Sequence, residues 1–246
     1  MVAIPKPTEV DLTPAPLHPR VVQEYDLGNY LYFDIETIPD QSESALAKAR
    51  ENVTPPGNIK KQESIDTWMA ENQERAAREL LHKTCLDGAT GHVCTIGWAI
   101  NDRQVHVEHA EDVGEERDIL TAFFRHVPPR DVTLVGHNVL GFDIPFLTKR
   151  AVILGVELPS DWAWPRDPKP WSKGVFDTMT AWAGARDRIS MNRLCGYLGI
   201  VGKSGFDGSM VADAWADGQH MTIAEYCDDD VRRTRSIHQK FLQAGF

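Results

Sequence analysis

The stretch that most restricts how this chain can fold is residues 30–37, which have the sequence YLYFDIET. Apolar and aromatic residues fill it and a proline follows two positions later, a pattern that predicts a β-strand. Side chains alternate between the two faces of a strand. One face would carry Leu31, Phe33 and Ile35, and the other would carry Tyr32, Asp34 and Glu36. Two carboxylates on one face of so apolar a strand are costly, because like charges repel and burial disfavours ionisation.

Asp34 and Glu36 can be explained in two ways. A divalent cation between the carboxylates would remove their conflict, which predicts a metal site. Alternatively, the two acids belong to a strand end and face water. These residues alone leave both interpretations open, so the decision depends on the rest of the chain.

The composition is that of an ordinary soluble globular protein. The chain has 246 residues, of which 42% are apolar and 25% charged, enough for one large domain with a filled core. Four scattered cysteines in a chain of this size favour a reducing compartment, and we expect a cytoplasmic protein. We find no signal-peptide pattern and no run of about 20 apolar residues, so we expect no membrane contact.

The net charge of −10 restricts the class of partner. A protein that coats nucleic acid non-specifically usually has a basic surface, so this class is disfavoured. An enzyme that binds a few nucleotides and holds metal ions with carboxylates remains compatible with the charge, because local basic patches then matter more than the total.

The chain divides into an arm and one domain. Five prolines between positions 5 and 19 predict an extended arm over residues 1–28. Residues 29–246 would form a single domain with a helical insertion at 41–90, which Pro55-Pro56-Gly57 breaks into two pieces. The insertion could be a basic lid over a substrate groove, but a solvated, packed helical insertion is the favoured interpretation.

The order of the remaining elements predicts an α/β fold. The expected further strands cover residues 92–100, 103–109, 132–135 and 175–176. The expected helices cover residues 115–127, 142–154, 191–198, 209–216 and 223–242. An antiparallel meander joined to parallel strands implies one mixed sheet flanked by helices.

A second acidic position follows the buried strand, in residues 136–143. Asp143 falls in the first turn of the next helix, where the helix dipole favours a negative charge, so it could be a helix cap as well as a ligand. Asn138 could hold the preceding loop through side-chain to main-chain hydrogen bonds.

The C-terminal helix carries a third acidic position. Thr222 and Glu225 form a capping-box pattern, which predicts where the helix begins. Tyr226 and Asp230 are four residues apart, so they lie on one face beside the apolar stripe of the helix. A carboxylate in that place needs a partner, and a metal ion shared with Asp34 would provide one.

Together these positions resemble the three motifs of the DEDD 3′–5′ exonucleases, namely Asp34-x-Glu36, Asn138-x3-Phe142-Asp143 and Tyr226-x3-Asp230. The tyrosine four residues before the last aspartate is typical of the tyrosine subclass, DEDDy. Residues 33–40 (FDIETIPD) and 223–234 (IAEYCDDDVRRT) are similar to small predicted exonucleases related to the proofreading domain of family B DNA polymerases. Each motif is short, but the three occur in order and on the expected elements.

The resemblance implies a ribonuclease H-like fold and hydrolysis of phosphodiester bonds with two divalent cations, Mg²⁺ or Mn²⁺. It implies that Asp34 contacts both ions, that Glu36 and Asp230 complete the site of one and that Asp143 holds the other. Tyr226 would orient the attacking water. The substrate would be single-stranded nucleic acid, degraded from its 3′ end, with DNA favoured over RNA.

The substrate contacts are less restricted by the sequence. Single strands are bound by aromatic stacking and by basic side chains. The candidates are Asn138, Phe142, Trp162, Trp164, Trp171, Arg186, Arg188 and Lys203. The tryptophans could instead pin a long loop onto the body, and Lys203 could be a solvated residue in a glycine-rich turn.

Two alternative functions stay open. An exoribonuclease fits the same motifs, because DNA and RNA are distinguished by contacts to the 2′-OH and not by metal ligands. A non-catalytic nucleic-acid-binding module on the same fold is the second alternative. The presence of all four acids and the tyrosine disfavours it.

Overall fold

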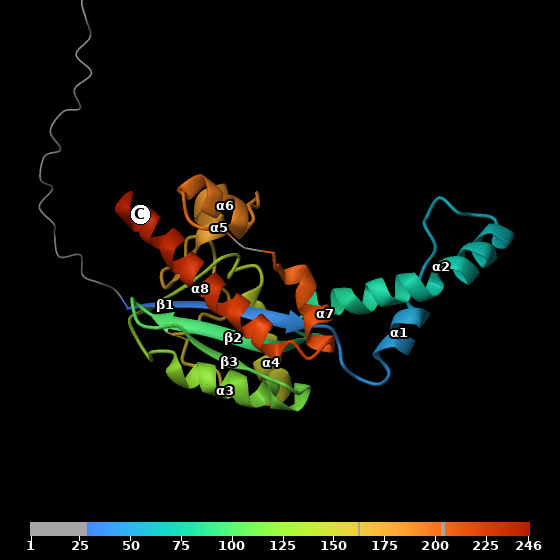
Figure 1. The fold of residues 1–246 in the computed structure, drawn as a ribbon, viewed down its shortest axis with the longest axis horizontal. Helices are drawn as coiled ribbons and strands as arrows, with labels where there is room; N and C mark the ends of the chain where they lie inside the picture. The colour runs from blue at the N-terminus through green and yellow to red at the C-terminus, as the bar shows by residue number, and fades with distance from the viewer. Residues whose placement is uncertain (1–28, 162, 203–204) are drawn as a thin grey trace, which may run out of the picture.

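A computed structural model describes residues 29–161, 163–202 and 205–246 of the chain (Figure 1). The arm expected at residues 1–28 lies outside the described residues. The strands form one sheet in the order β3-β2-β1-β4-β5. They are β1 (Asn29–Ile38), β2 (His92–Ile100), β3 (His106–His109), β4 (Val132–Gly136) and β5 (Val175–Asp177). Because β1 pairs antiparallel with β2 and parallel with β4, the predicted mixed sheet is confirmed.

Helices cover both faces of this sheet. They are α1 (Ala45–Glu51), α2 (Gln62–Lys83), α3 (Glu116–His126), α4 (Asp143–Leu154), α5 (Thr178–Ala183), α6 (Met191–Leu198), α7 (Val211–Ala216) and α8 (His220–Gln243). The long helix α8 crosses one face, and α3 and α4 cover the other (Figure 1). Within the described part of the chain, no helix has the length and apolar character needed to cross a bilayer.

The predicted alternation along β1 decides what each face of the sheet contacts. Leu31, Phe33 and Ile35 enter the main core together with the buried side chains of α3 and α4. The ring of Phe33 lies 5.5 Å from that of Phe123 and 5.7 Å from that of Trp164. The opposite face of β1 is thereby left for α8.

Gly97 of β2 lets α8 approach the sheet closely. It pairs with Asp34 across β1 and β2. A Cβ atom at this position would lie 3.0 Å from both the Cys227 Sγ and a methyl group of Val231, so tight a contact that these side chains would have to shift by a few tenths of an ångström. The absence of a side chain at position 97 therefore sets the distance between β1 and the helix that carries Tyr226 and Asp230.

A buried ion pair joins the helices on the other face. Arg150 of α4 and Glu116 of α3 form two short contacts, 2.6 Å and 2.7 Å long, and only 4% and 1% of these residues is exposed. Glu116 also accepts a 2.8 Å hydrogen bond from the Val93 N–H of β2. Such a pair stabilises the fold only as long as both partners are present, because removal of one leaves a buried charge.

The insertion after β1 contains α1 and α2, and it projects from the body of the domain (Figure 1). Its arginines are paired with acids: Arg50 and Arg78 with Glu74, and Arg75 with Glu79. This mixture of charges supports the solvated helical insertion rather than the basic lid.

The structure differs from the sequence-based expectation at three elements. Helix α8 begins at His220 rather than at residue 223, after a turn at Gly218. The Gln219 carbonyl accepts the first backbone hydrogen bonds of the helix, so Thr222 already lies inside the helix and the expected capping box is absent. Strand β3 begins at His106 instead of residue 103, since Arg103 still belongs to the turn. Helix α5 was not expected, and the Asp177 side chain caps it.

We predict that Gly97→Ala separates α8 from β1. The added methyl group would force Cys227 and Val231 to shift, so we expect a loss of about 1–3 kcal/mol in the free energy of unfolding, measured by urea denaturation. Gly57→Ala is the matched control, because nothing lies within 4 Å of a Cβ there. Equal stability of the two variants would contradict the close approach.

We also predict a pH dependence of stability from His238 of α8. The side chain is 1% exposed, its Nδ1 lies 3.0 Å from the Tyr32 hydroxyl, and burial lowers its pKa from 6.5 to about 4. The unfolded chain therefore binds a proton between pH 6.5 and 4 that the folded chain does not. Stability should fall as the pH drops through this window, by up to ~3 kcal/mol.

His238→Gln removes the titrating group and should flatten that part of the pH profile. The measurement is the free energy of unfolding from pH 7.5 to 4 for wild type, His238→Gln and His82→Gln, an exposed histidine of α2. A profile of His238→Gln parallel to that of wild type would refute the assignment.

Candidate active site

The two carboxylates of β1 face α8. Asp34 is half-buried and Glu36 is 7% exposed. Ligand atoms of Asp34, Glu36 and Cys227 all lie within 4.8 Å of one another. Like charges this close raise the free energy of the site unless a cation or protons compensate them.

Helix α8 adds Tyr226 and Asp230 to the same group. Both residues are buried, with 8% and 4% exposed. The Tyr226 hydroxyl hydrogen-bonds to the Asp230 carboxylate and lies in the field of Asp34 and Glu36. Because these two residues are one helical turn apart, a single face of α8 delivers both to the acids of β1.

The hydroxyl of Tyr226 keeps its proton. Burial raises its pKa first, and the negative charges of Glu36, Asp230 and Asp34 raise it further. Tyr226 can therefore donate a hydrogen bond in this site, but it cannot serve as a base near neutral pH.

Two cysteines line the site without the properties of ligands. The Cys227 thiol donates to the Asp34 carbonyl at 3.5 Å, and the Cys94 thiol donates to the Glu36 carbonyl at 3.4 Å. Burial, followed by the nearby carboxylates, raises the pKa of both thiols. Both thiols therefore stay neutral and donate hydrogen bonds to the backbone of β1. They are poorly suited to bind a metal ion, because the sulfur that binds a metal is a thiolate.

Asp143 reaches the same strand from α4. It is 4% exposed, and burial together with the charge of Asp177 raises its pKa to about 7. Hydrogen bonds from its own N–H and from the Ile35 N–H act in the opposite direction. Ile35 stands between Asp34 and Glu36 in the chain, so this bond places Asp143 against the strand that carries both acids.

Asp177, at the end of β5, was missed by the sequence patterns. Its carboxylate accepts bonds from the N–H groups of Asn138 and Leu140, both 3.0 Å long, and it also caps α5 through Met179 and Thr180. It thus fixes the loop before Asp143. An aspartate between a short strand and a helix is an N-cap signal that could have revealed it.

Asn138 has a left-handed backbone conformation, with φ of 68°. Its main-chain carbonyl accepts from the N–H groups of Gly141 and Phe142, at 3.0 Å and 2.9 Å. The loop is thus held by the Asn138 backbone at both its N–H and its carbonyl. Phe142 is half-buried, and its ring lies 5.4 Å from that of Phe146.

Arg233 is a second residue near the site that the motifs did not indicate. Its guanidinium donates to Asp230 at 2.9 Å and to Asp229 at 3.0 Å, and it approaches the Gly202 carbonyl at 3.5 Å. It therefore links an acid of the site to the loop before α7.

The other residues expected to contact the substrate differ in how exposed they are. Trp164 is fully buried among the rings of Phe33, Phe123 and Phe124, which contradicts the prediction that it stacks on a base. Trp171 is 80% exposed in the loop before β5. Trp162 and Lys203 lie outside the described residues. Arg186 and Arg188 are exposed between α5 and α6.

The donor set fits divalent cations that prefer oxygen. Asp34, Glu36, Asp143 and Asp230 offer carboxylate oxygens, and three of these residues are less than 9% exposed. The raised pKa of Asp143 shows how poorly the protein alone tolerates its charge. Magnesium and manganese suit such ligands, whereas the neutral thiols do not attract them.

Comparison with known proteins supplies the family. A family described as "Predicted 3′-5′ exonuclease related to the exonuclease domain of PolB" matches residues 86–244, more than half of the chain. The chain belongs to this family of PolB-related exonucleases. The matched stretch contains Asp143, Tyr226 and Asp230, and it begins after the strand with Asp34 and Glu36.

Relatives of this PolB-related exonuclease include larger enzymes. DNA polymerase 2 of Aeropyrum pernix is 27% identical in an alignment 169 residues long, which covers 62% of this chain and 21% of the polymerase. The family B DNA polymerase of Pyrobaculum calidifontis has a similar fold, with a TM-score of 0.55 and 21% identity over 87% of this chain and 24% of that one. The chain thus spans about a quarter of the length of these polymerases or less.

We predict that Asp143→Asn stabilises the metal-free PolB-related exonuclease at high pH. Because the folded pKa of Asp143 is raised to about 7, its contribution to stability is present below the unfolded pKa and is lost as the pH rises through 7. In a chelator, the wild type should lose on the order of 3 kcal/mol between pH 5 and 8 relative to Asp143→Asn.

Thermal unfolding of both proteins in the chelator, at several pH values, measures this difference. Glu71→Gln, at an exposed acid of α2, is the control and should follow the wild type. An Asp143→Asn protein with the same pH profile as wild type would show that Asp143 titrates normally.

Proposed function

We propose that the protein is a two-metal 3′–5′ exonuclease of the DEDDy type, with a ribonuclease H-like fold, that hydrolyses single-stranded DNA from its 3′ end. The observation that carries this proposal is the convergence of Asp34 and Glu36 of β1 with Tyr226 and Asp230 of α8 in one buried acidic group. The family membership supports exonuclease activity, and the relationship to DNA polymerases supports DNA as the substrate.

The roles of the residues follow from their positions. Asp34, Glu36 and Asp230 would hold one cation, and Asp34 and Asp143 would hold the other. When bound, the two cations activate the attacking water and stabilise the departing 3′ oxygen. Tyr226, which keeps its proton and donates a hydrogen bond to Asp230, accepts a hydrogen bond from the attacking water and so orients the water.

The surroundings of the acids support this arrangement. Asp177 holds the loop that delivers Asp143, so it acts as a positioning residue. Arg233 donates to one oxygen of Asp230 at 2.9 Å, which helps to orient that carboxylate. The neutral thiols of Cys94 and Cys227 hold the backbone of β1 between them.

The decisive experiment uses 5′-labelled single-stranded DNA and RNA of one sequence with Mg²⁺. We expect the wild type to shorten DNA from the 3′ end, and Asp34→Ala to be slower by about 10³-fold or more, because several kcal/mol of charge stabilisation are lost. Asp228→Asn, at a partly exposed acid paired with Arg232, is the control and should keep wild-type activity.

Each other outcome names a different function. Shortening of RNA alone would make the protein an exoribonuclease. Binding of the strands without any shortening would indicate the non-catalytic module. Equal degradation by wild type and Asp34→Ala would reject the site.

Tyr226→Phe tests the role of the hydroxyl alone. The ring packs against Phe206 at a centroid distance of 5.0 Å, and this contact is retained in the variant. We expect kcat to fall by about 10²-fold with KM nearly unchanged, since the lost hydrogen bond acts on the water and not on strand binding. A change confined to KM would contradict this role.

A further inference from the structure

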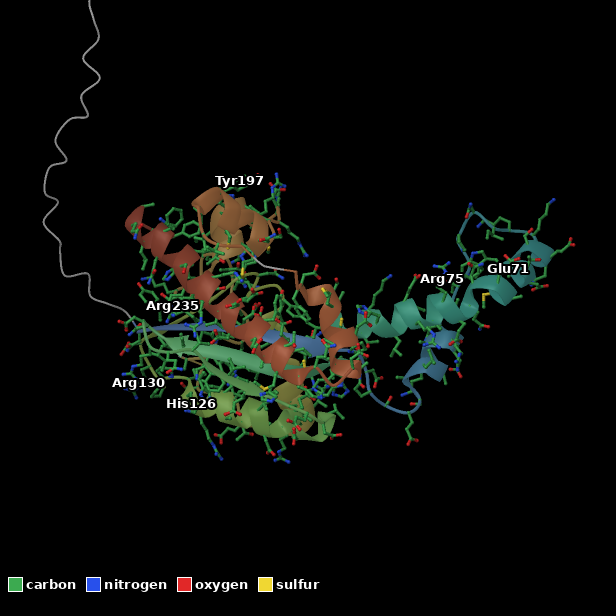
Figure 2. The ribbon with its side chains drawn as sticks, viewed as in Figure 1. Glu71, Arg75, His126, Arg130, Tyr197 and Arg235 are labelled. Carbon is green, nitrogen blue, oxygen red and sulfur yellow. The ribbon has the colours of Figure 1, made fainter. Side chains whose placement is uncertain are left out.

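Helices α5 and α6 present aromatic side chains to solvent. The rings of Trp182 and Tyr197 stack at a centroid distance of 6.2 Å and an interplanar angle of 20°, although 45% and 58% of these residues is exposed. The guanidinium of Arg193 lies over the Tyr197 ring, 5.6 Å from its centroid. Tyr197 stands on the outer side of α6 (Figure 2). Large exposed aromatic groups of this kind mark interaction sites.

The charge around these rings is opposite to that of the chain as a whole. Residues 178–202 contain three arginines and one acid, whereas the whole chain has a net charge of −10. Arg186 and Arg188 are exposed in the loop between α5 and α6, and within the described residues neither is in an ion pair. We call Trp182, Arg186, Arg188, Arg193 and Tyr197 the α5–α6 patch.

The same two helices are anchored to the loop that opens the acidic site. His137, next to Asn138, contacts the Thr178 hydroxyl at 2.9 Å at the start of α5. Its other ring nitrogen donates to the Ile189 carbonyl at 3.0 Å, one residue after Arg188. The patch therefore has a fixed position relative to Asp143.

An apolar hollow continues the patch beyond Trp182. It has a volume of about 390 Å³, and its lining includes Trp182, Leu198, Phe241 and Phe246, with Lys240 as the charged member. The edge of Trp182 meets Phe241 at 6.4 Å. An apolar space beside an exposed indole, with a cation in its lining, suits a nucleobase and the phosphate attached to it.

We propose that the α5–α6 patch and this hollow bind the single strand upstream of the nucleotide that is cleaved. The proposal rests on the proposed function, because it takes the acidic site as the place of hydrolysis. Stacking rings and unpaired arginines match the bases and phosphates of a single strand and need no particular sequence. Three of the four charged residues in positions 178–202 are arginines, a balance that favours a polyanion over a protein partner.

The position of the hollow sets a minimum length for the substrate. Phe241 follows Asp230 by eleven residues on α8, which corresponds to about 16 Å along the helix. At the 3.4 Å spacing of stacked bases, a strand needs about five nucleotides to cover this distance. Shorter substrates should therefore gain nothing from the patch.

The test measures binding and hydrolysis separately. Binding of a fluorescent 20-nucleotide DNA strand is measured by anisotropy in an Asp34→Asn background, which slows digestion. We expect Tyr197→Ala to weaken binding about tenfold and Tyr197→Phe to change it less than about twofold, because only the first removes the ring. Arg186→Ala and Arg188→Ala should each reduce the slope of log K against log[salt] by about 0.7.

Controls lie on the opposite face of the sheet. Val152→Ala on α4 and Arg125→Ala on α3 replace one exposed apolar and one exposed basic residue, and both should bind the strand like the parent protein. Trp182 also contacts Phe241, so Trp182→Ala is interpreted only if its thermal unfolding matches that of the parent.

Hydrolysis by the otherwise wild-type protein supplies the second measurement. For Tyr197→Ala, kcat/KM on the 20-nucleotide strand should fall about tenfold, while kcat/KM on the p-nitrophenyl ester of thymidine 5′-monophosphate stays within about twofold.

Any of three results would contradict the proposal that the patch binds the strand: unchanged strand binding in the patch variants, an equal loss of kcat/KM on the ester, or a change only in self-association measured by sedimentation. If the wild type digests no nucleic acid but strand binding still depends on the patch, the proposed function is wrong and the strand-binding role of the patch is retained.

Discussion

The contact between α8 and β1 is the constraint on which the acidic site depends. Gly97 favours this contact, because a side chain there would press against Cys227 and Val231. This close packing has a chemical consequence as well as a structural one. It brings the Tyr226 hydroxyl and the Asp230 carboxylate from one end of the sequence into the field of Asp34 and Glu36 from the other. The core on the opposite face, with its buried Arg150–Glu116 pair, holds the sheet on which this contact is built.

The same contact concentrates negative charge where water is scarce. Glu36, Asp143 and Asp230 are each less than 9% exposed, and among the described residues Arg233 donates to Asp230. On the α4 side of the site, burial and then the charge of Asp177 raise the pKa of Asp143. Any cation that binds such a site would stabilise the folded protein. The neighbouring thiols and the Tyr226 hydroxyl stay protonated, so the negative charge of the site comes from its carboxylates.

Much of this arrangement follows from the sequence. The alternation in residues 30–37 predicts which side chains enter the core, and the spacing of Tyr226 and Asp230 predicts that they share a face, because both rules depend only on local geometry. The contributions of Asp177 and Arg233 could not be read in the same way. Asp177 acts on backbone groups about 40 residues earlier in the chain, and Arg233 acts through a loop carbonyl, so only the fold reveals their partners. The sequence left open whether the tryptophans pin their loop or stack on bases, and the burial of Trp164 follows the first alternative, since nothing in a tryptophan-rich loop tells which ring faces inward.

The insertion formed by α1 and α2 leaves and re-enters the domain through a narrow neck. At that neck the Thr37 hydroxyl donates to the Cys85 carbonyl and the Asp40 N–H donates to the Thr84 hydroxyl, both at 2.8 Å. These bonds close the strand ends independently of what lies between them. The insertion could therefore differ in length or surface while the acids a few residues upstream keep their places. The closed ends make it a separable appendage of the domain.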